Sequence, residues 1–137
     1  MYEIIIATHG PMAEGMKASL TMFTDQIDHV HTACLDAKGI ATFEQKVEAL
    51  IETVKDKDTL ILCDIGFATP FNTFAKNIDR FEKDVEIIAG VNMPALLEAV
   101  ILQQTSTLKE ITQSFANSIR PVSLKEQLSA VENSDDE

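Results

Sequence analysis

The sequence predicts an α/β fold, a doubly wound and mainly parallel sheet with the flavodoxin-like strand order 2-1-3-4. Apolar runs of strand length alternate along the chain with stretches of helical period, which is typical of repeated βα units. The first run contains Ile4-Ile5-Ile6 and has the apolar character of a strand covered on both faces. A chain of 137 residues can bury a little under ~70% of its unfolded surface, so one core can hold it as a single domain.

The predicted strands are the four apolar runs. They span Tyr2–Ala7, His29–Leu35, Thr59–Cys63 and Val85–Ala89. The second run is less apolar than the others, which places it nearer an edge of the sheet. Because right-handed crossovers join such strands, their carboxyl ends meet at one edge, where ligands bind in open parallel sheets.

Five helices are predicted between and after these strands. They span Pro11–Phe23, Thr42 to about Val54, Pro70 to about Phe81, Ala95–Gln103, and Thr107 to about Ser118. Pro11 suits a first helical turn, and the large apolar residues after it share one face of the helix. These residues are Met12, Met16, Leu20 and Phe23.

Two of the helices have a sequence signal at their start. Thr42 with Gln45, and Thr107 with Glu110, have the spacing of capping boxes. The helix that begins near Thr42 also has a set of apolar side chains predicted to face inward. They are Phe43, Val47, Leu50, Ile51 and Val54.

The C-terminal part of the chain differs in composition. Ile119–Ser123 is a candidate for a short last strand, and we place it at an edge because Pro121 cannot donate to a central ladder. Glu132–Glu137 has four acids in six residues and no large apolar side chain. We therefore expect a folded domain over residues 1–123 and an acidic, disordered tail over residues 124–137.

The charge of the chain limits its partners. The formal net charge is −11, with 11 Lys and Arg against 22 Asp and Glu. The phosphates of a nucleic acid or an anionic membrane would repel this surface, whereas a basic protein would be attracted. No run of eighteen apolar residues is present, so we expect no direct membrane insertion. The chain also enters its first strand without a basic leader, which predicts a cytoplasmic protein.

The cysteines and two of the histidines do not form a site. Cys34 and Cys63 stand 29 positions apart, outside the spacing of metal or redox motifs, so no disulfide, metal or cofactor is predicted. His29 and His31 are two apart, which is a chelating spacing on one strand face. No cluster of Cys, Asp or Glu joins them at ligand spacing, so exposed edge histidines are the favoured interpretation.

The chemistry is expected where the strands end. His9 follows the first strand and Asp64 follows the third, so strand order 2-1-3 places them across one crevice. A carboxylate bound to one imidazole nitrogen fixes the tautomer and raises the basicity of the other nitrogen, which can then attack phosphorus or accept a proton. The helix N-termini after Pro11 and Pro70 would point N–H groups at the same place, which suits an anion.

Three motifs in this order resemble those of the IIA component of the mannose-type phosphotransferase system. They are Thr8-His9-Gly10 after an apolar strand, Asp64 followed by Pro70-Phe71-Asn72, and the run from Ala89 to Glu98. The resemblance implies that His9 takes a phosphoryl group from the histidine phosphocarrier protein and passes it to a IIB component during sugar uptake. It also implies that Asp64 orients His9 and that the turn Phe67, Ala68 and Thr69 binds the phosphoryl oxygens.

The resemblance further implies a homodimer in which an antiparallel C-terminal strand is exchanged between subunits, a part that Ile119–Ser123 could play. The chain departs from the family at one place, because the usual Gly-Gly before Thr-Pro is replaced by Phe67-Ala68 and a glycine stands at position 66 instead. If the pair serves a positive φ, either Gly66 relocates the bend or the phosphate turn has a different shape.

Other functions are compatible with parts of this pattern. A histidine-type phosphatase would clamp phosphate with several arginines, but only Arg80 and Arg120 are present and neither is near His9 in the sequence. A receiver domain would need an acidic pair after the first strand. A regulatory or adaptor IIA-like domain, including the phosphotransfer subunit type of dihydroxyacetone kinase, stays open as an alternative. The sequence does not indicate which sugar is imported.

Overall fold

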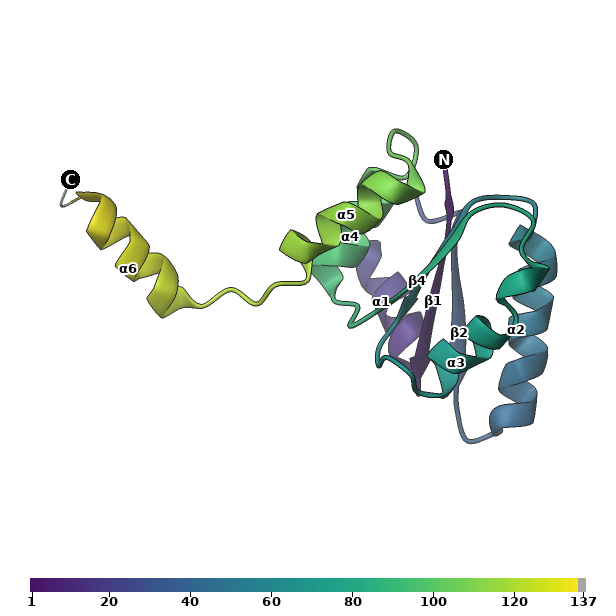
Figure 1. Cartoon of the computed structure of the whole chain (residues 1–137). Coiled ribbons are helices and arrows are strands. Elements are labelled where there is room, and N and C mark those ends of the chain that lie inside the picture. Colours follow the sequence, from purple (N-terminus) through teal and green to yellow (C-terminus); the bar gives the residue numbers. More distant parts are fainter. Residues whose placement is uncertain (136–137) are drawn as a thin grey trace.

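A four-stranded parallel sheet forms the centre of the computed structural model, which describes residues 1–135 (Figure 1). The strands are β1 (Glu3–His9), β2 (Val30–Leu35), β3 (Thr59–Cys63) and β4 (Val85–Ala89). Their order is β2-β1-β3-β4, and every neighbouring pair is parallel. The predicted strand order is therefore confirmed, and so is the position of β2 at an edge.

The helices cover both faces of the sheet (Figure 1). One face packs against α1 (Met12–Leu20), α4 (Met93–Ile101) and α5 (Leu108–Ser118). The other face packs against α2 (Ile40–Val54) and α3 (Thr69–Lys76), which the short 3₁₀ helix η1 (Ile78–Arg80) follows. Among residues 1–135, no helix is long and apolar enough to cross a bilayer.

The two cores explain why β1 is apolar. Ile4 and Ile6 point into the core under α1, α4 and α5, whereas Ile5 and Ala7 point into the core under α2 and α3. All four side chains are fully buried. Since successive side chains alternate between faces, a strand that is covered on both sides cannot show the polar alternation of a half-exposed strand.

The starts and faces of two helices differ from the prediction. In α1, Met16 and Leu20 are buried as predicted, but Met12 and Phe23 are exposed because they lie at and beyond the helix ends. The capping box at Thr42 and Gln45 is wrong: α2 begins at Ile40 after Gly39, and the Thr42 hydroxyl donates to the Lys38 carbonyl instead. The glycine turn, with φ of 94° at Gly39, starts the helix earlier than the polar pair suggested.

The second predicted capping box is confirmed. The Thr107 hydroxyl accepts from the Glu110 N–H at 3.1 Å, and a Glu110 carboxylate oxygen accepts from the Thr107 N–H at 3.3 Å. α4 has a comparable start, because Asn92 Oδ1 accepts from the Ala95 N–H at 2.9 Å. The Asn92 amide also donates to the Ile119 carbonyl at 3.3 Å, which ties the start of α4 to the end of α5.

The C-terminal segment differs from the prediction. Ile119–Ser123 is not a strand within this chain: the segment after Ile119 is exposed, and no strand of residues 1–135 lies beside it. Where a disordered tail was predicted, residues 124–135 form the helix α6 (Leu124–Asp135), which stands away from the sheet (Figure 1). The Ser123 hydroxyl accepts from the Glu126 N–H at the start of this helix. After Ser123 an apolar residue follows at every third or fourth position, which is a helical pattern. The prediction of disorder gave more weight to the acidic residues at the end of the chain. The last two residues of the predicted tail, 136–137, lie outside the described part of the chain.

Candidate functional site

His9 and Asp64 meet at the carboxyl end of the sheet. His9 is the last residue of β1 and Asp64 directly follows β3, the neighbouring strand. The His9 Nδ1 atom lies 2.9 Å from Asp64 Oδ2, and the His9 backbone N–H donates to the same oxygen at 3.1 Å. The predicted pairing across the crevice is therefore present in the structure.

The environment of Asp64 keeps its carboxyl group ionised. Its side chain is only 11% exposed, and this burial by itself raises the pKa of Asp64. The hydrogen bonds from the His9 side chain and backbone, with the Ile65 N–H that donates to Oδ1 at 2.9 Å, outweigh burial and hold the pKa of Asp64 below its ordinary value. Each of these donors stabilises the charged form. Asp64 is thus a fixed negative charge beside the imidazole.

The pairing also assigns the two nitrogens of His9. A carboxylate can only accept a hydrogen bond, so Nδ1 carries the proton that it donates to Asp64. Nε2 then holds the free lone pair of the ring. The His9 side chain is 43% exposed, so this nitrogen is accessible from outside. The arrangement is that of an oriented nucleophile or base.

The turn after Asp64 is built around a non-glycine residue in the left-handed region. Phe67 has a φ of 60°, and it is the one residue other than glycine with positive φ in the described chain. Gly66 does not take over the bend. Its own φ is not positive, and a Cβ atom at this position would lie 3.3 Å from the Ala89 Cβ on β4, a tight contact that a small shift of Ala89 would relieve. The left-handed conformation of Phe67 costs roughly 1–2 kcal/mol of backbone strain.

Two helices begin beside these turns. The buried Thr8 hydroxyl accepts from the Ala13 N–H at 2.8 Å and so ties the end of β1 to the first turn of α1. Gly10, with φ of 60°, makes the sharp turn between them. α3 starts at Thr69. The residue before it is Ala68, whose methyl side chain cannot cap the helix. Such an end leaves helix N–H groups for an anion. The predicted phosphate-turn residues Phe67, Ala68 and Thr69 thus lie at the entry to α3.

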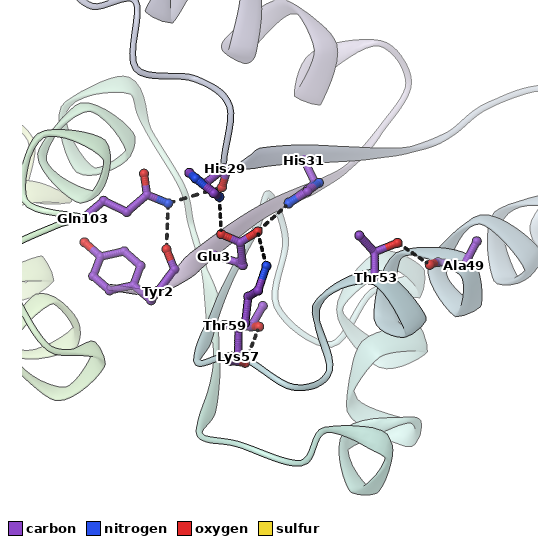
Figure 2. A network of polar contacts seen from close by, with 9 residues as sticks. All are labelled: Tyr2, Glu3, His29, His31, Ala49, Thr53, Lys57, Thr59 and Gln103. Atoms are coloured by element: carbon purple, nitrogen blue, oxygen red, sulfur yellow. Dashed lines mark hydrogen bonds and ion pairs between the residues drawn. The ribbon is translucent and has the colours of Figure 1, made fainter.

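His29 and His31 lie near the amino ends of β1 and β2, at the opposite end of the sheet from His9, and Figure 2 shows them beside Glu3. Their imidazoles contact the buried Glu3 carboxylate, with His29 Nδ1 at 2.8 Å and His31 Nε2 at 3.2 Å from its two oxygens. Lys57 Nζ lies 4.0 Å from the same carboxylate. The two histidines and Lys57 are therefore the polar partners of a buried carboxyl group. Sequence reasoning missed this role because Glu3 lies inside an apolar strand. Within residues 1–135, no group of three His, Cys, Asp or Glu side chains could hold a metal ion.

The arginines are engaged elsewhere. Arg80 Nη2 donates to Glu52 on α2 at 2.9 Å, and its Nη1 lies 3.9 Å from Glu48. Arg120 lies in the exposed segment after α5. This placement gives no support to a phosphatase-type site, where guanidinium groups would have to converge on the phosphate at the histidine.

Comparison with known proteins identifies the family of the chain. The family model for the fructose IIA component of the phosphotransferase system matches residues 3–116. The chain belongs to this family. The family is that of a phosphocarrier in sugar uptake, so this IIA component has that role, and the predicted resemblance to the mannose-type system is confirmed.

Individual relatives support the assignment over most of the chain. The fructose-specific EIIA component of Bacillus subtilis is 31% identical over 81% of this chain and 77% of its own length. The sorbose-specific EIIA component of Lacticaseibacillus casei is 28% identical over 85% of this chain and 90% of its own. The crystal structure of an EIIA component from Streptococcus agalactiae has the same fold, with a TM-score of 0.81 and 22% identity over 92% of this chain and 99% of its own.

Proposed function

We propose that this IIA component carries the phosphoryl group on Nε2 of His9. The observation that carries the proposal is the 2.9 Å contact between His9 Nδ1 and Asp64, which leaves Nε2 as the nucleophilic nitrogen. His9 ends a central strand at the ligand-binding edge of the sheet. The other two histidines are turned toward Glu3 at the opposite end.

The transfer needs no cofactor. The Nε2 lone pair of His9 forms a bond to phosphorus while the P–N bond of the donor phosphohistidine breaks and its electron pair returns to the donor ring. Nδ1 keeps its proton, so the phosphorylated His9 ring is cationic and the Asp64 carboxylate balances it. If the donor ring is protonated in the same way, it leaves as a neutral imidazole, and no further acid or base is required. The return step, to a histidine of the acceptor, is the same exchange.

The phosphoryl oxygens would be held by the turn at Phe67, Ala68 and Thr69. Its backbone N–H groups and the start of α3 offer donors to a dianion, which the helix dipole also favours. Phe67 takes a positive φ in this turn, the conformation that a glycine would otherwise supply. We therefore assign phosphate binding at this turn to backbone N–H groups. Because these groups do not depend on the side chains, we expect the site to be active with Phe67-Ala68 in place of the usual Gly-Gly pair.

The partners in this proposal are two proteins in the cytoplasm, the histidine phosphocarrier protein as donor and a IIB component as acceptor. The family of this chain supports both. The named relatives are transport components, so the adaptor alternative is not favoured. Because the group passes between histidines, the IIA component acts as a phosphotransferase with a transient phosphohistidine.

A reconstituted relay tests this function. With phosphoenolpyruvate, enzyme I and the phosphocarrier, we expect one phosphate per chain that is labile in acid and stable in base, as a phosphohistidine should be. Adding the cognate IIB component should remove the label and transfer it to that protein. A chain that takes up no phosphate, while a fructose-specific relative does so in the same mixture, would favour the adaptor alternative.

We also propose that the chain is a homodimer with exchanged C-terminal segments. β4 is an edge strand, and Val85, Ile87 and Ile88 on it are only partly buried. Ile119–Ser123 has no partner strand within residues 1–135, so pairing it antiparallel with β4 of a second copy would cover both. α6 presents an apolar stripe that the second copy would also cover, made of Leu124, Leu128 and Val131.

Truncation separates the exchanged segment from the acidic end. Ending the chain after Ser118 should give an aggregating or monomeric protein, because the edge at β4 is then uncovered. Removing only residues 132–137 should leave the dimer intact. Sedimentation of the full chain at micromolar concentration measures the oligomeric state, and a monomer there would contradict the exchange.

A further inference from the structure

Phe67 is unfavourable in two independent ways where it stands. Its backbone is in the left-handed region, where glycine would be free of strain, and its residue surface is 82% exposed. A glycine at this position would relieve the strain and would expose no apolar ring to water. Local folding therefore does not account for an aromatic side chain here.

The ring is held in one place. Its centroid lies 4.9 Å from that of Phe71 on α3, with the planes tilted by 49°. The backbone is fixed as well, since the Asn72 side-chain amide donates to the Phe67 carbonyl at 2.9 Å. An aromatic side chain has few rotatable bonds and therefore loses little entropy when a partner covers it, and aromatic residues dominate the binding energy of many interfaces.

Other exposed apolar side chains follow the two halves of the site in the sequence. Ile65, directly after Asp64, is 56% exposed. Met12, the first residue of α1 and three positions after His9, is 44% exposed. We call Met12, Ile65 and Phe67 the His9 collar. Both turns leave the same edge of the sheet, so the collar belongs to the end of the molecule that also holds the exposed His9 imidazole.

We propose that Phe67 is a specificity-determining contact for the protein that brings the phosphoryl group, and that the His9 collar is where this donor docks. The inference rests on the proposed function of His9. The donor carries a dianionic phosphoryl group toward a chain of net charge −11, so long-range repulsion must be offset. The fitting partner is a protein whose phosphohistidine is surrounded by apolar side chains, with basic side chains outside them.

The test compares a protein donor with a small one. Phosphoramidate contains the same kind of P–N bond but has no surface to dock, so its rate reports on His9 and its phosphate turn alone. For each variant we divide the kcat/KM for the phosphorylated carrier by the rate constant for phosphoramidate. Phe67→Gly removes the ring and the strain, whereas Phe67→Ala removes the ring and keeps the strain.

Both variants should lower this ratio by about 10- to 30-fold, mainly through a higher KM for the carrier, as expected for loss of an interface hot spot. Phe23→Ala, which removes an exposed aromatic ring beyond the far end of α1, is the matched control and should leave the ratio unchanged. A ratio that is unchanged in Phe67→Gly would overturn the docking role of the ring. A ratio that falls in Phe67→Ala but not in Phe67→Gly would also overturn it, because the strained backbone and not the missing ring would then be the cause. If the wild type takes phosphate from neither donor, the proposed function itself fails.

Discussion

Replacing His9 by alanine should abolish phosphoryl acceptance, while replacing His29 should not. His9 is the histidine at the carboxyl end of the sheet, and its Nε2 is the nitrogen that the contact with Asp64 leaves free. The other two imidazoles, those of His29 and His31, contact Glu3 at the opposite end of the sheet. The label from the phosphorylated carrier should therefore fall to background in His9→Ala, and it is measured as acid-labile phosphate bound to the protein.

His29→Ala is a matched control because both histidines make the same kind of contact. His29 Nδ1 lies 2.8 Å from the Glu3 carboxylate, much as His9 Nδ1 lies 2.9 Å from that of Asp64. The His29 pair is at the amino end of β1, away from the helix N-termini that would hold a phosphoryl group. Both variants are checked for folding by thermal unfolding. Label that persists in His9→Ala would refute the assignment of the site.

Asp64→Asn should slow the transfer by about 10- to 100-fold, at ~1.4 kcal/mol for each factor of ten. The imidazole gains positive charge as phosphorus approaches Nε2, so the carboxylate stabilises the transition state more than the ground state. An asparagine keeps the shape but not the charge, and its amide can favour the wrong tautomer of His9. Rapid-quench measurement of transfer from the carrier gives the rate. Equal rates in both proteins would mean that Asp64 only shapes the turn.

The same substitution has an effect on stability whose sign is set by the lowered pKa of Asp64. A carboxyl group with a lower pKa in the folded state stabilises the fold above its unfolded pKa of ~3.9, and this contribution is lost as the pH falls through the folded value. At neutral pH we expect Asp64→Asn to lower the free energy of unfolding by about 1 kcal/mol, because the amide keeps an acceptor oxygen but loses the charge. In urea titrations this difference should shrink as the pH is lowered below about 4, whereas a constant difference would show that the charge is not responsible.

The local sequence was sufficient for the elements whose boundaries depend on short-range signals. β3 and β4 have the predicted bounds, because each is a short apolar run between polar turns. The start of α5 follows from the reciprocal bonds of Thr107 and Glu110, two residues that are three positions apart. The order of the strands was predicted by analogy with flavodoxin-like sheets, because right-handed crossovers reduce the possible arrangements of four βα units without selecting one.

The tertiary structure decided what depends on groups far apart in the chain. The sequence placed His9 and Asp64, 55 positions apart, at neighbouring strand ends, but only the register of β1 and β3 brings Nδ1 to 2.9 Å from the carboxylate and thereby selects Nε2. The positive φ falls on Phe67 and not on Gly66, although the sequence offered the glycine as the place for the bend. Glu3 can be buried inside an apolar strand because His29 and His31 reach it from β2 and the residue before it. Each of these outcomes depends on packing and charge between elements, and the periodicity of a single segment contains no information about either.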